Sequence, residues 1–295
     1  MNQVAENIEV RRPVMRYHGG KWRIAPWIIA QFPKHRVYVE PYGGAGAVLL
    51  QKPRSHSEIY NDLWDDVVNV FRVLRDPDKA EQLRRAVALT PFSRTEMLES
   101  DKPAEDEIER ARRIIYRSYS GFGSASANSL HKTGFRSNSR MSGNAPSMDW
   151  RNWPDHIASF TERLRGVCIE SRPALDLIRQ HDAVDTLFYL DPPYVHSTRG
   201  MRRRNAAYQF EMTDDDHRDL ANVLSEATGM VFLSGYRSGI YDELYAGWKR
   251  IDRKSYADGA AKRIESLWLN PAAAKHGQQH LDLDATAPRG HEHGK

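Results

Sequence analysis

The sequence is poor in cysteine and has no long apolar run. A single cysteine, Cys168, excludes a disulfide within the chain and a metal site made of several cysteines. No apolar run approaches the roughly 20 residues that a membrane-spanning helix needs, and residues 1–12 are polar and of mixed charge rather than signal-like. We therefore expect a cytoplasmic protein of enzyme size. The flanking Val167 and Ile169 predict that Cys168 is buried in a strand.

The sequence also has little excess charge. It contains 43 Lys and Arg against 39 Asp and Glu in 295 residues, a formal net charge of +4. Two groups of arginines nevertheless stand close together: Arg136 and Arg140, and Arg199, Arg202, Arg203 and Arg204. Clustered guanidinium groups suit phosphates, which favours a polyanionic partner. Each cluster taken alone is equally well explained as a solvated run of charge.

The apolar pattern predicts alternating strands and helices. Runs rich in β-branched and aromatic residues predict strands at 35–40, 58–60, 167–170, 184–190, 230–234, 248–256 and 263–270. Helical spacing and helix breakers predict helices that start at residue 47 and cover about 67–75, 80–89, 105–116, 174–180 and 213–226. The pair Asp258-Gly259 between the last two strands is typical of a hairpin turn. At this length the chain is expected to form one large domain or a core with a substantial insertion.

Residues 91–165 differ from the rest of the chain. The stretch 118–148 is dense in Gly, Ser and Asn and contains Phe122, His131 and Phe135. It predicts an inserted region, partly helical and partly loop, that presents side chains to a partner; a flexible linker is the alternative. The catalytic domain then comprises residues 14–90 and 166–271. Residues 272–295 are expected to be a disordered tail whose histidines lack a metal-ligand arrangement, so we expect no metal.

The most informative feature is the tetrapeptide Asp191-Pro192-Pro193-Tyr194, which follows the apolar run 186–190. This run predicts a buried strand, and two successive prolines cannot continue a sheet. The chain must therefore leave the sheet in an extended bend that holds a carboxylate and an aromatic ring. Open α/β sheets bind their ligands at such carboxyl ends. We predict a ligand site there, with a proline-rich surface turn as the alternative.

A glycine turn follows the first predicted strand, at residues 40–46, which read Glu-Pro-Tyr-Gly-Gly-Ala-Gly. Its glycines let the backbone come close to a ligand. The spacing lacks the last glycine of a dinucleotide fingerprint, and no Lys-Ser or Lys-Thr pair follows as in a P-loop. The second predicted strand leads to Asp62, where a carboxylate is well placed for ribose hydroxyls. Glu40 could attract a cationic amino group or be structural.

Four motifs in one order resemble the Dam-type family of adenine-specific DNA methyltransferases. They are the loop Tyr17-His18-Gly19-Gly20-Lys21, the turn 40–46, Asp62 and the tetrapeptide 191–194, with a long insert before the last. The resemblance covers residues 14–271. We accordingly predict a doubly wound α/β fold: a mostly parallel, Rossmann-like sheet with a terminal antiparallel hairpin and an inserted target-recognition region. The resemblance implies S-adenosylmethionine as the methyl donor.

The resemblance also implies which residues form the site. The cofactor-binding residues that it implies are Tyr17, Gly19, Gly20, Lys21, Glu40, Pro41, Gly43, Gly44, Ala45, Gly46, Asp62 and Asp191. Adenine is expected to swing out of double-stranded DNA into a catalytic pocket formed by Asp191, Pro192, Pro193 and Tyr194. There its amine donates to the Asp191 carboxylate and the Pro192 carbonyl, and its ring stacks on Tyr194. Lys21 is expected to meet a carboxylate of the donor, and Tyr17 its cationic or aromatic portion.

The resemblance is weaker in the insert, because the segment after residue 140 departs from the family pattern. The residues that we predict to contact DNA are Arg136, Asn138 and Arg140, which read base edges, and Arg199, Arg202, Arg203 and Arg204, which grip the backbone. The target sequence stays open, as does a companion restriction endonuclease or a phage setting, and we expect a monomer. Cys168 is poorly situated for the thiolate attack that methylation of cytosine carbon requires.

Three alternatives to adenine methylation in DNA stay open from the sequence. The amine of cytosine poses the same chemical problem as that of adenine, although the leading aspartate of the tetrapeptide resembles the adenine enzymes more. A methyltransferase of this fold could act on RNA or on a protein glutamine. A DNA-binding protein could keep the fold without turnover, although the intact Lys21, Asp62 and Asp191 favour an enzyme.

Overall fold

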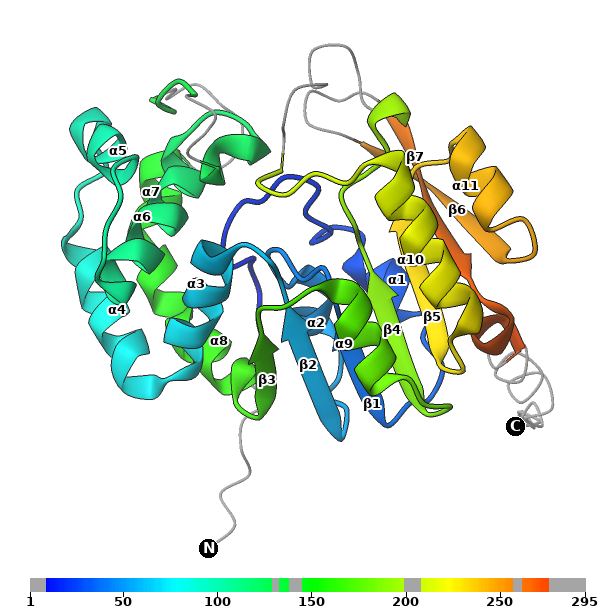
Figure 1. The fold of residues 1–295 in the computed structure, drawn as a ribbon. Helices are drawn as coiled ribbons and strands as arrows, with labels where there is room; N and C mark the ends of the chain where they lie inside the picture. The colour runs from blue at the N-terminus through cyan, green and yellow to red at the C-terminus, as the bar shows by residue number, and fades with distance from the viewer. Residues whose placement is uncertain (1–8, 129–132, 138–144, 199–207, 257–261, 276–295) are drawn as a thin grey trace, which may run out of the picture.

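A seven-stranded sheet forms the centre of the computed structural model, which describes residues 9–128, 133–137, 145–198, 208–256 and 262–275 (Figure 1). In spatial order the strands are β3 (Val167–Glu170), β2 (Ser57–Asn61), β1 (Val37–Glu40), β4 (Thr186–Leu190), β5 (Met230–Gly235), β7 (Lys262–Leu269) and β6 (Lys249–Tyr256). The first five pair in parallel, whereas β7 runs antiparallel to both β5 and β6. The predicted fold is confirmed, although the turn between β6 and β7 lies outside the described residues.

Helices cover both faces of this sheet (Figure 1). They are α9 (Ala174–His181), α10 (Asp214–Glu226) and α11 (Gly239–Leu244) on one face, and α1 (Ala25–Ile29) and α2 (Ala47–Gln51) on the other. Alternate strand residues point to opposite layers: Tyr38 and Tyr189 join the core under α1 and α2, whereas Val39 and Phe188 join the other core. Burial on both faces explains why these strands are unbroken apolar runs.

The remaining helices form a bundle beside β3, at the left of Figure 1. They are α3 (Asp65–Arg75), α4 (Pro77–Leu89), α5 (Arg94–Ser100), α6 (Glu107–Ser120), α7 (Pro146–Arg151) and α8 (Ile157–Leu164), with short 3-10 helices at Ser124–Ala127, Trp153–His156 and, after β4, His196–Thr198. Helix α6 belongs to the region predicted as an insert, yet it packs against α3 and α4, which precede that region. The described part of 91–165 contributes no strand to the sheet and shares the core of the first half of the chain.

Polar side chains fix the ends of several helices. Asp76 separates α3 from α4, and its Oδ1 accepts hydrogen bonds from the backbone N–H groups of Asp78 and Lys79 at 3.0 and 3.2 Å. Thr213 and Asp216 form a reciprocal capping box at the start of α10. This capping box fixes the point at which residues 208–212 lead into α10, and these residues line the cavity of the candidate active site.

Two sequence expectations need correction. Cys168 is exposed rather than buried, because its side chain points to the face of β3 opposite Val167 and Ile169, which pack in the core, and belongs to neither core cluster. The predicted tail begins too early, because residues 271–275 are helical and Ala273 is fully buried in the core. The structured part of the chain therefore extends to residue 275 at least; residues 276–295 lie outside the described ranges.

Two kinds of feature are absent from the part of the chain that the structure describes. No helix there is both long and apolar enough to span a membrane. No group of three or more His, Cys, Asp or Glu side chains there could hold a metal ion.

Candidate active site

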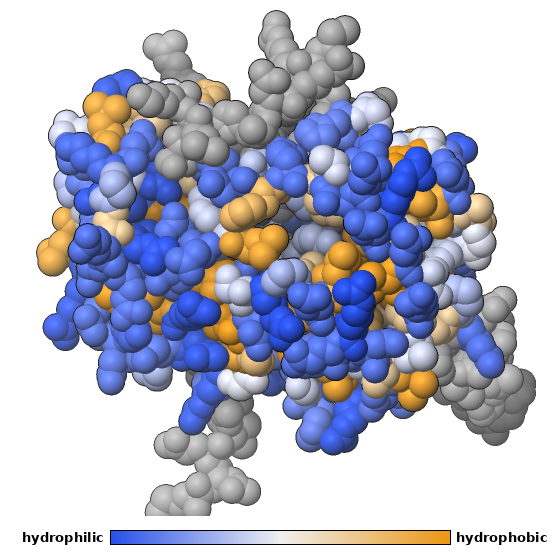
Figure 2. All heavy atoms as spheres, in the orientation of Figure 1, coloured by the Kyte–Doolittle hydropathy of each residue, from blue (hydrophilic) through white to orange (hydrophobic). Residues whose placement is uncertain are grey.

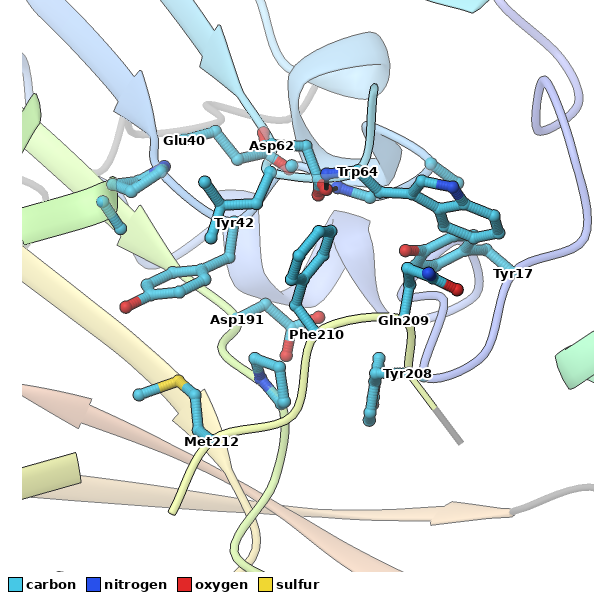
Figure 3. Close-up of a pocket in the computed structure, with 18 of the residues that line it drawn as sticks. Tyr17, Glu40, Tyr42, Asp62, Trp64, Asp191, Tyr208, Gln209, Phe210 and Met212 are labelled. Atoms are coloured by element: carbon cyan, nitrogen blue, oxygen red, sulfur yellow. Dashed lines mark hydrogen bonds between the residues drawn. The ribbon is translucent and has the colours of Figure 1, made fainter. Parts of the chain in front are cut away.

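A cavity of about 350 Å³ opens at the carboxyl ends of β1, β2 and β4 (Figure 3). Strand β1 pairs with β2 on one side and with β4 on the other, so the winding of the chain reverses direction at β1. Open α/β sheets bind ligands at this switch point. The volume lies within the range of small-molecule sites. The cavity is lined by every residue predicted to bind the cofactor except Gly46.

Glycines let the turn after β1 pass against two aromatic rings. A Cβ on Gly43 would lie 2.2 Å from the ring of Tyr60, and one on Gly44 would lie 2.8 Å from the ring of Tyr17. Gly44 also has a φ of +48°, which L side chains rarely adopt. The Tyr60 hydroxyl donates to the Gly44 carbonyl at 2.6 Å, which fastens the turn to β2. The backbone can therefore form one wall of the cavity.

Asp62, just after β2, fastens the same turn from the other side. Its Oδ2 accepts a hydrogen bond from the Gly44 N–H at 2.8 Å, and its Oδ1 accepts one from the Trp64 N–H at 2.8 Å. Burial raises the pKa of Asp62, and these two N–H groups oppose that rise. Each oxygen keeps a second lone pair, so Asp62 retains the capacity for the predicted ribose contact.

Glu40, the last residue of β1, is 2% exposed. Its Oε2 accepts hydrogen bonds from the Tyr38 hydroxyl at 2.8 Å and from the Leu49 N–H at 3.0 Å. Burial nevertheless raises the pKa of Glu40 to about 8. The group is therefore mostly protonated at neutral pH and would have to lose this proton before it could attract a cationic amino group.

Replacing Glu40 with glutamine should flatten the pH dependence of stability between pH 6 and 8. In the unfolded chain the Glu40 pKa is about 4.5, so over this range only the unfolded state has released its proton. The wild-type free energy of unfolding therefore falls as pH rises toward the folded pKa of about 8, whereas the amide of the variant does not titrate. Urea unfolding of both proteins at several pH values measures the difference, and parallel curves would contradict the assignment.

Lys21 and Asp191 form a buried ion pair at the floor of the cavity. The Lys21 Nζ lies 2.9 Å from Asp191 Oδ2 and 3.5 Å from Glu265 Oε1, and it donates to the Gly19 carbonyl at 2.7 Å. Burial alone would lower the pKa of Lys21, but the two carboxylates outweigh burial and raise it. Burial raises the pKa of Asp191 to about 6 against the opposing effect of Lys21. Lys21 thus lines the cavity, but the carboxylates that it contacts are protein groups, and its expected contact with a carboxylate of the donor stays a prediction.

Asp191 keeps one oxygen available. Its Oδ2 is held by Lys21, whereas its Oδ1 is buried and accepts no hydrogen bond from any residue in the described ranges. A buried acceptor without a donor costs free energy in the unliganded protein. The geometry therefore suits a ligand that brings an N–H or O–H group to this atom.

The other members of the tetrapeptide occupy different environments. Pro193 lines the cavity, whereas Pro192 and Tyr194 do not. The ring of Tyr194 is buried: the Lys21 ammonium lies 4.8 Å from its centroid, and Tyr236 contacts its edge. Its hydroxyl donates to Glu265 Oε1. Tyr194 therefore anchors this part of the floor, and its predicted stacking on a base stays a prediction.

Several wall residues were missed by sequence reasoning. They are the apolar and aromatic residues Leu63, Trp64, Pro173, Leu175, Phe210 and Met212. Phe210 points into the middle of the cavity, between Asp62 and Asp191 in the view of Figure 3. Figure 2 shows the surface of the molecule in the orientation of Figure 1, and apolar side chains gather near the centre of this view with hydrophilic ones around them. Residues 208–212, which form part of this wall, carried no predicted role.

The charge of the lining is mainly negative. Its carboxylates belong to Glu40, Asp62, Asp191, Glu211, Asp216 and Asp219, and its only lysine or arginine among the described residues is Lys21. Since Lys21 is already paired, the cavity favours a ligand that carries positive charge. Flat aromatic walls and a close glycine backbone add room for a ring system.

Comparison with known families identifies this arrangement. The model of the D12 class N6 adenine-specific DNA methyltransferases matches residues 17–255, which include the glycine turn, Asp62 and the tetrapeptide. The chain belongs to this family. A comparison with curated proteins gave no match. Family membership confirms the resemblance drawn from the four motifs, and it identifies the chain as a methyltransferase with DNA as the substrate class.

The predicted DNA-contacting residues of this methyltransferase are only partly described. Arg136 is half-buried, and its Nη1 donates to the Tyr119 carbonyl at 3.1 Å. Burial and the neighbouring Arg16 lower the pKa of Arg136. The rest lie outside the described residues: Asn138, Arg140, Arg199, Arg202, Arg203 and Arg204. Arg136 keeps capacity for a base edge, because a guanidinium carries five N–H donors.

Proposed function

We propose that this chain transfers a methyl group from S-adenosylmethionine to the exocyclic amine of an adenine that is rotated out of duplex DNA. The observation that carries the proposal is the state of Asp191. Lys21 fixes its Oδ2, and its Oδ1 is a buried acceptor without a donor among the described residues, at the carboxyl edge of the sheet. An exocyclic amine brings the N–H group that this atom lacks.

The cavity suits S-adenosylmethionine in charge and shape. The donor carries a positively charged sulfonium and an ammonium, which match the carboxylates of the lining. Asp62 can accept hydrogen bonds from its ribose, and the glycine turn leaves space beside the backbone. When bound, the donor supplies an electrophilic methyl carbon. A cation near Glu40 favours the ionised form of that residue, so donor binding is expected to release a proton near pH 7.

The tetrapeptide positions the amine. Adenine's exocyclic nitrogen is a weak nucleophile because its lone pair is delocalised into the ring. Hydrogen bonds from its two N–H groups to Asp191 Oδ1 and to the Pro192 carbonyl favour a pyramidal nitrogen whose lone pair faces the methyl carbon. Catalysis then rests on holding nitrogen and carbon about 3 to 3.5 Å apart and in line. Because the base must leave the stack to reach this edge, extrusion precedes transfer.

Transfer of a labelled methyl group tests the proposal. Purified protein is incubated with tritiated S-adenosylmethionine and duplex DNA, and the DNA is digested to nucleosides. The expected product is N6-methyladenine, which requires both donor and duplex. Label in cytosine, or donor binding without any transfer, would contradict it. Transfer to RNA or to protein glutamine in parallel reactions, but not to duplex DNA, would contradict it as well.

Replacing Arg202, Arg203 and Arg204 with alanine should weaken DNA binding and reduce its salt dependence. Each phosphate contact contributes about 0.9 to the slope of log K against log salt, so losing three contacts should lower the slope by roughly 2 to 3. Titration of labelled duplex at several salt concentrations gives this slope. The control variant also replaces exposed arginines with alanine: Arg84 and Arg85, which pair with Glu81 on the surface of α4. An unchanged slope would remove the arginine cluster from the interface.

A further inference from the structure

Glu265, on β7, does not line the cavity but contacts Lys21 and Tyr194 at its floor, and no motif assigns it a role. It is 4% exposed. Its Oε1 accepts the hydrogen bond of the Tyr194 hydroxyl and lies 3.5 Å from the Lys21 Nζ. Lys21 in turn contacts Asp191 at 2.9 Å. One buried ammonium is therefore shared by two buried carboxylates, which we call the Lys21 triad (Lys21, Asp191 and Glu265).

The charge of this triad bears on the proposed reaction. Methyl transfer moves positive charge from the donor's sulfur to the acceptor's nitrogen, which lies beside Asp191. A lysine paired with Asp191 alone would neutralise the carboxylate that should stabilise this charge. With Glu265 present, the triad carries a net charge of −1, and Lys21 is drawn toward the second carboxylate as well. Preorganised charge of the correct sign in a buried site is the most effective electrostatic aid to catalysis.

We infer that Glu265 is a positioning residue, which keeps Lys21 and Tyr194 in place and leaves the Lys21 triad negatively charged where the amine becomes cationic. The inference rests on the proposed function. Strand β7 thereby contributes a residue to the reaction, in addition to the tetrapeptide. The inference also gives a reason why Lys21 is buried next to Asp191.

The groups that face Asp191 determine its titration. They are Lys21, Glu265, Glu40, Tyr17, Tyr189, Tyr194 and Tyr241. Glu40 stays mostly protonated below pH 7, because its pKa is about 8. Over the range in which Asp191 titrates, near its pKa of about 6, Glu265 is therefore the carboxylate that repels it. Removing this negative charge should lower the pKa of Asp191.

The test compares Glu265→Gln with Glu265→Asp. Glutamine keeps the size and can still accept from Tyr194 but removes the charge, so kcat should fall roughly 10- to 100-fold with the KM for the donor changed less than about twofold. The acidic limb of the kcat profile should have a midpoint near pH 6 in the wild type, and that midpoint should move to lower pH in Glu265→Gln. Aspartate keeps the charge, so its midpoint should stay close to that of the wild type.

A buried carboxylate elsewhere in the sheet serves as the control. Glu58 pairs with Lys52 at 2.6 Å and with Arg163 at 2.7 Å, and it does not line the cavity. Glu58→Gln should lower stability yet leave the midpoint unchanged. If the wild type transfers methyl groups and Glu265→Gln keeps either its kcat or its midpoint, this inference alone is overturned. If the aspartate variant shifts like the glutamine variant, charge is not the cause and the inference also fails. Absence of transfer by the wild type would overturn the proposed function and the inference together.

The β6–β7 hairpin carries a second, independent inference. The last pair between β5 and β7 is Gly235 with Ser266. Beyond Ser266, the pairing between β6 and β7 continues for four residues on each strand, from Arg253 with Glu265 to Tyr256 with Lys262. We call these eight residues and the turn between them the extension. At about 3.3 Å per residue, the hairpin extends roughly 13 Å beyond the carboxyl end of β5. That end lies at the same edge of the sheet as Asp191, because β4 and β5 are parallel.

The extension is basic. Its basic residues are Arg253 and Lys254 on β6 and Lys262 and Arg263 on β7. Its acidic residues are Glu265, which is buried, and Asp258, which lies between the two strands in the sequence. Arg253 and Lys254 are exposed and make no salt bridge to a residue in the described ranges. Nearer the opposite end of β6, by contrast, Arg250 pairs with Asp242 and Asp252. We propose that this extension contacts the phosphate backbone of the DNA beside the extruded base, because the duplex must approach the same edge for that base to enter the cavity.

Neutralising the extension tests this contact. Arg253→Gln combined with Lys254→Gln keeps much of each side chain and should lower the slope of log K against log salt by about 1 to 2. Lys249→Gln, at the other end of β6, is the control and should leave the slope unchanged. If the wild type binds DNA and the double variant shows the same slope of log K against log salt, the extension does not contact the phosphate backbone. Methyl transfer can still occur in that case, so the proposed function is tested separately.

Discussion

Replacing Asp191 with alanine should reduce the rate of methyl transfer by roughly a thousandfold or more. In the proposed mechanism, the change removes the acceptor that orients the amine and also the negative charge next to the nitrogen. The fold should survive, because Lys21 keeps the Gly19 carbonyl and Glu265 as partners. Single-turnover transfer with labelled donor and saturating duplex measures the rate, and thermal unfolding measures the stability.

The control for this change is Asp176→Ala. Asp176 is an exposed carboxylate on α9 that pairs with Arg179 at 3.5 Å and does not line the cavity. It should leave the transfer rate unchanged and alter stability by less than about 1 kcal/mol. If Asp191→Ala turned over within tenfold of the wild type, Asp191 would not orient the amine.

Gly43→Ala should abolish tight binding of the donor. A Cβ at this position would lie 2.2 Å from Tyr60, whose ring is fully buried and stacks on Phe71 with a centroid distance of 4.2 Å. Because Tyr60 cannot retreat, the turn must move into the cavity. We expect a loss of roughly 1 to 3 kcal/mol in the free energy of unfolding and a donor affinity at least about tenfold lower. Calorimetric titration with a donor analogue measures the affinity.

Gly239 offers a matched control for the glycine turn. It is the first residue of α11, and a Cβ there would meet nothing within 4 Å. Gly239→Ala should therefore be neutral or slightly stabilising, with unchanged donor affinity. Equal affinities in Gly43→Ala and the wild type would show that the turn does not approach the donor.

The sheet could be predicted from the sequence because its central strands are buried on both faces. Val39 and Phe188 pack under one layer of helices while Tyr38 and Tyr189 pack under the other, so each strand stands out as a continuous apolar run. The burial of side chains on the edge strand β3 was harder to predict from the sequence. Only one face of β3 is packed in the core, which leaves Cys168 exposed on the other face, and local sequence cannot reveal this.

The helices of residues 91–165 were the least predictable part of the fold. The sequence predicted a single helix there, at 105–116, yet the region also contains the short helices α5, α7 and α8. Trp150 and Trp153 are buried there, and their indole N–H groups donate to the carbonyls of Thr90 and Val14. Such contacts join residues far apart in the chain, so the local pattern does not show them.

Sequence reasoning found the cavity but not every relationship inside it. The glycine turn, Asp62 and the tetrapeptide indicated the correct edge of the sheet, because each follows a strand whose carboxyl end lies there. Phe210 and Glu265 come from segments that only the fold brings to this edge. The pairing of Lys21 with Asp191 also depends on burial and distance, which motifs do not specify.

A structure of the protein bound to duplex DNA and to a donor analogue without a transferable methyl group tests the central claim most directly. The account predicts an adenine outside the helix whose exocyclic nitrogen lies about 3 Å from both Asp191 Oδ1 and the Pro192 carbonyl. That nitrogen should face the donor from the side on which the methyl group would stand. An adenine whose amine points away from Asp191, with the donor bound in the same cavity, would contradict the account.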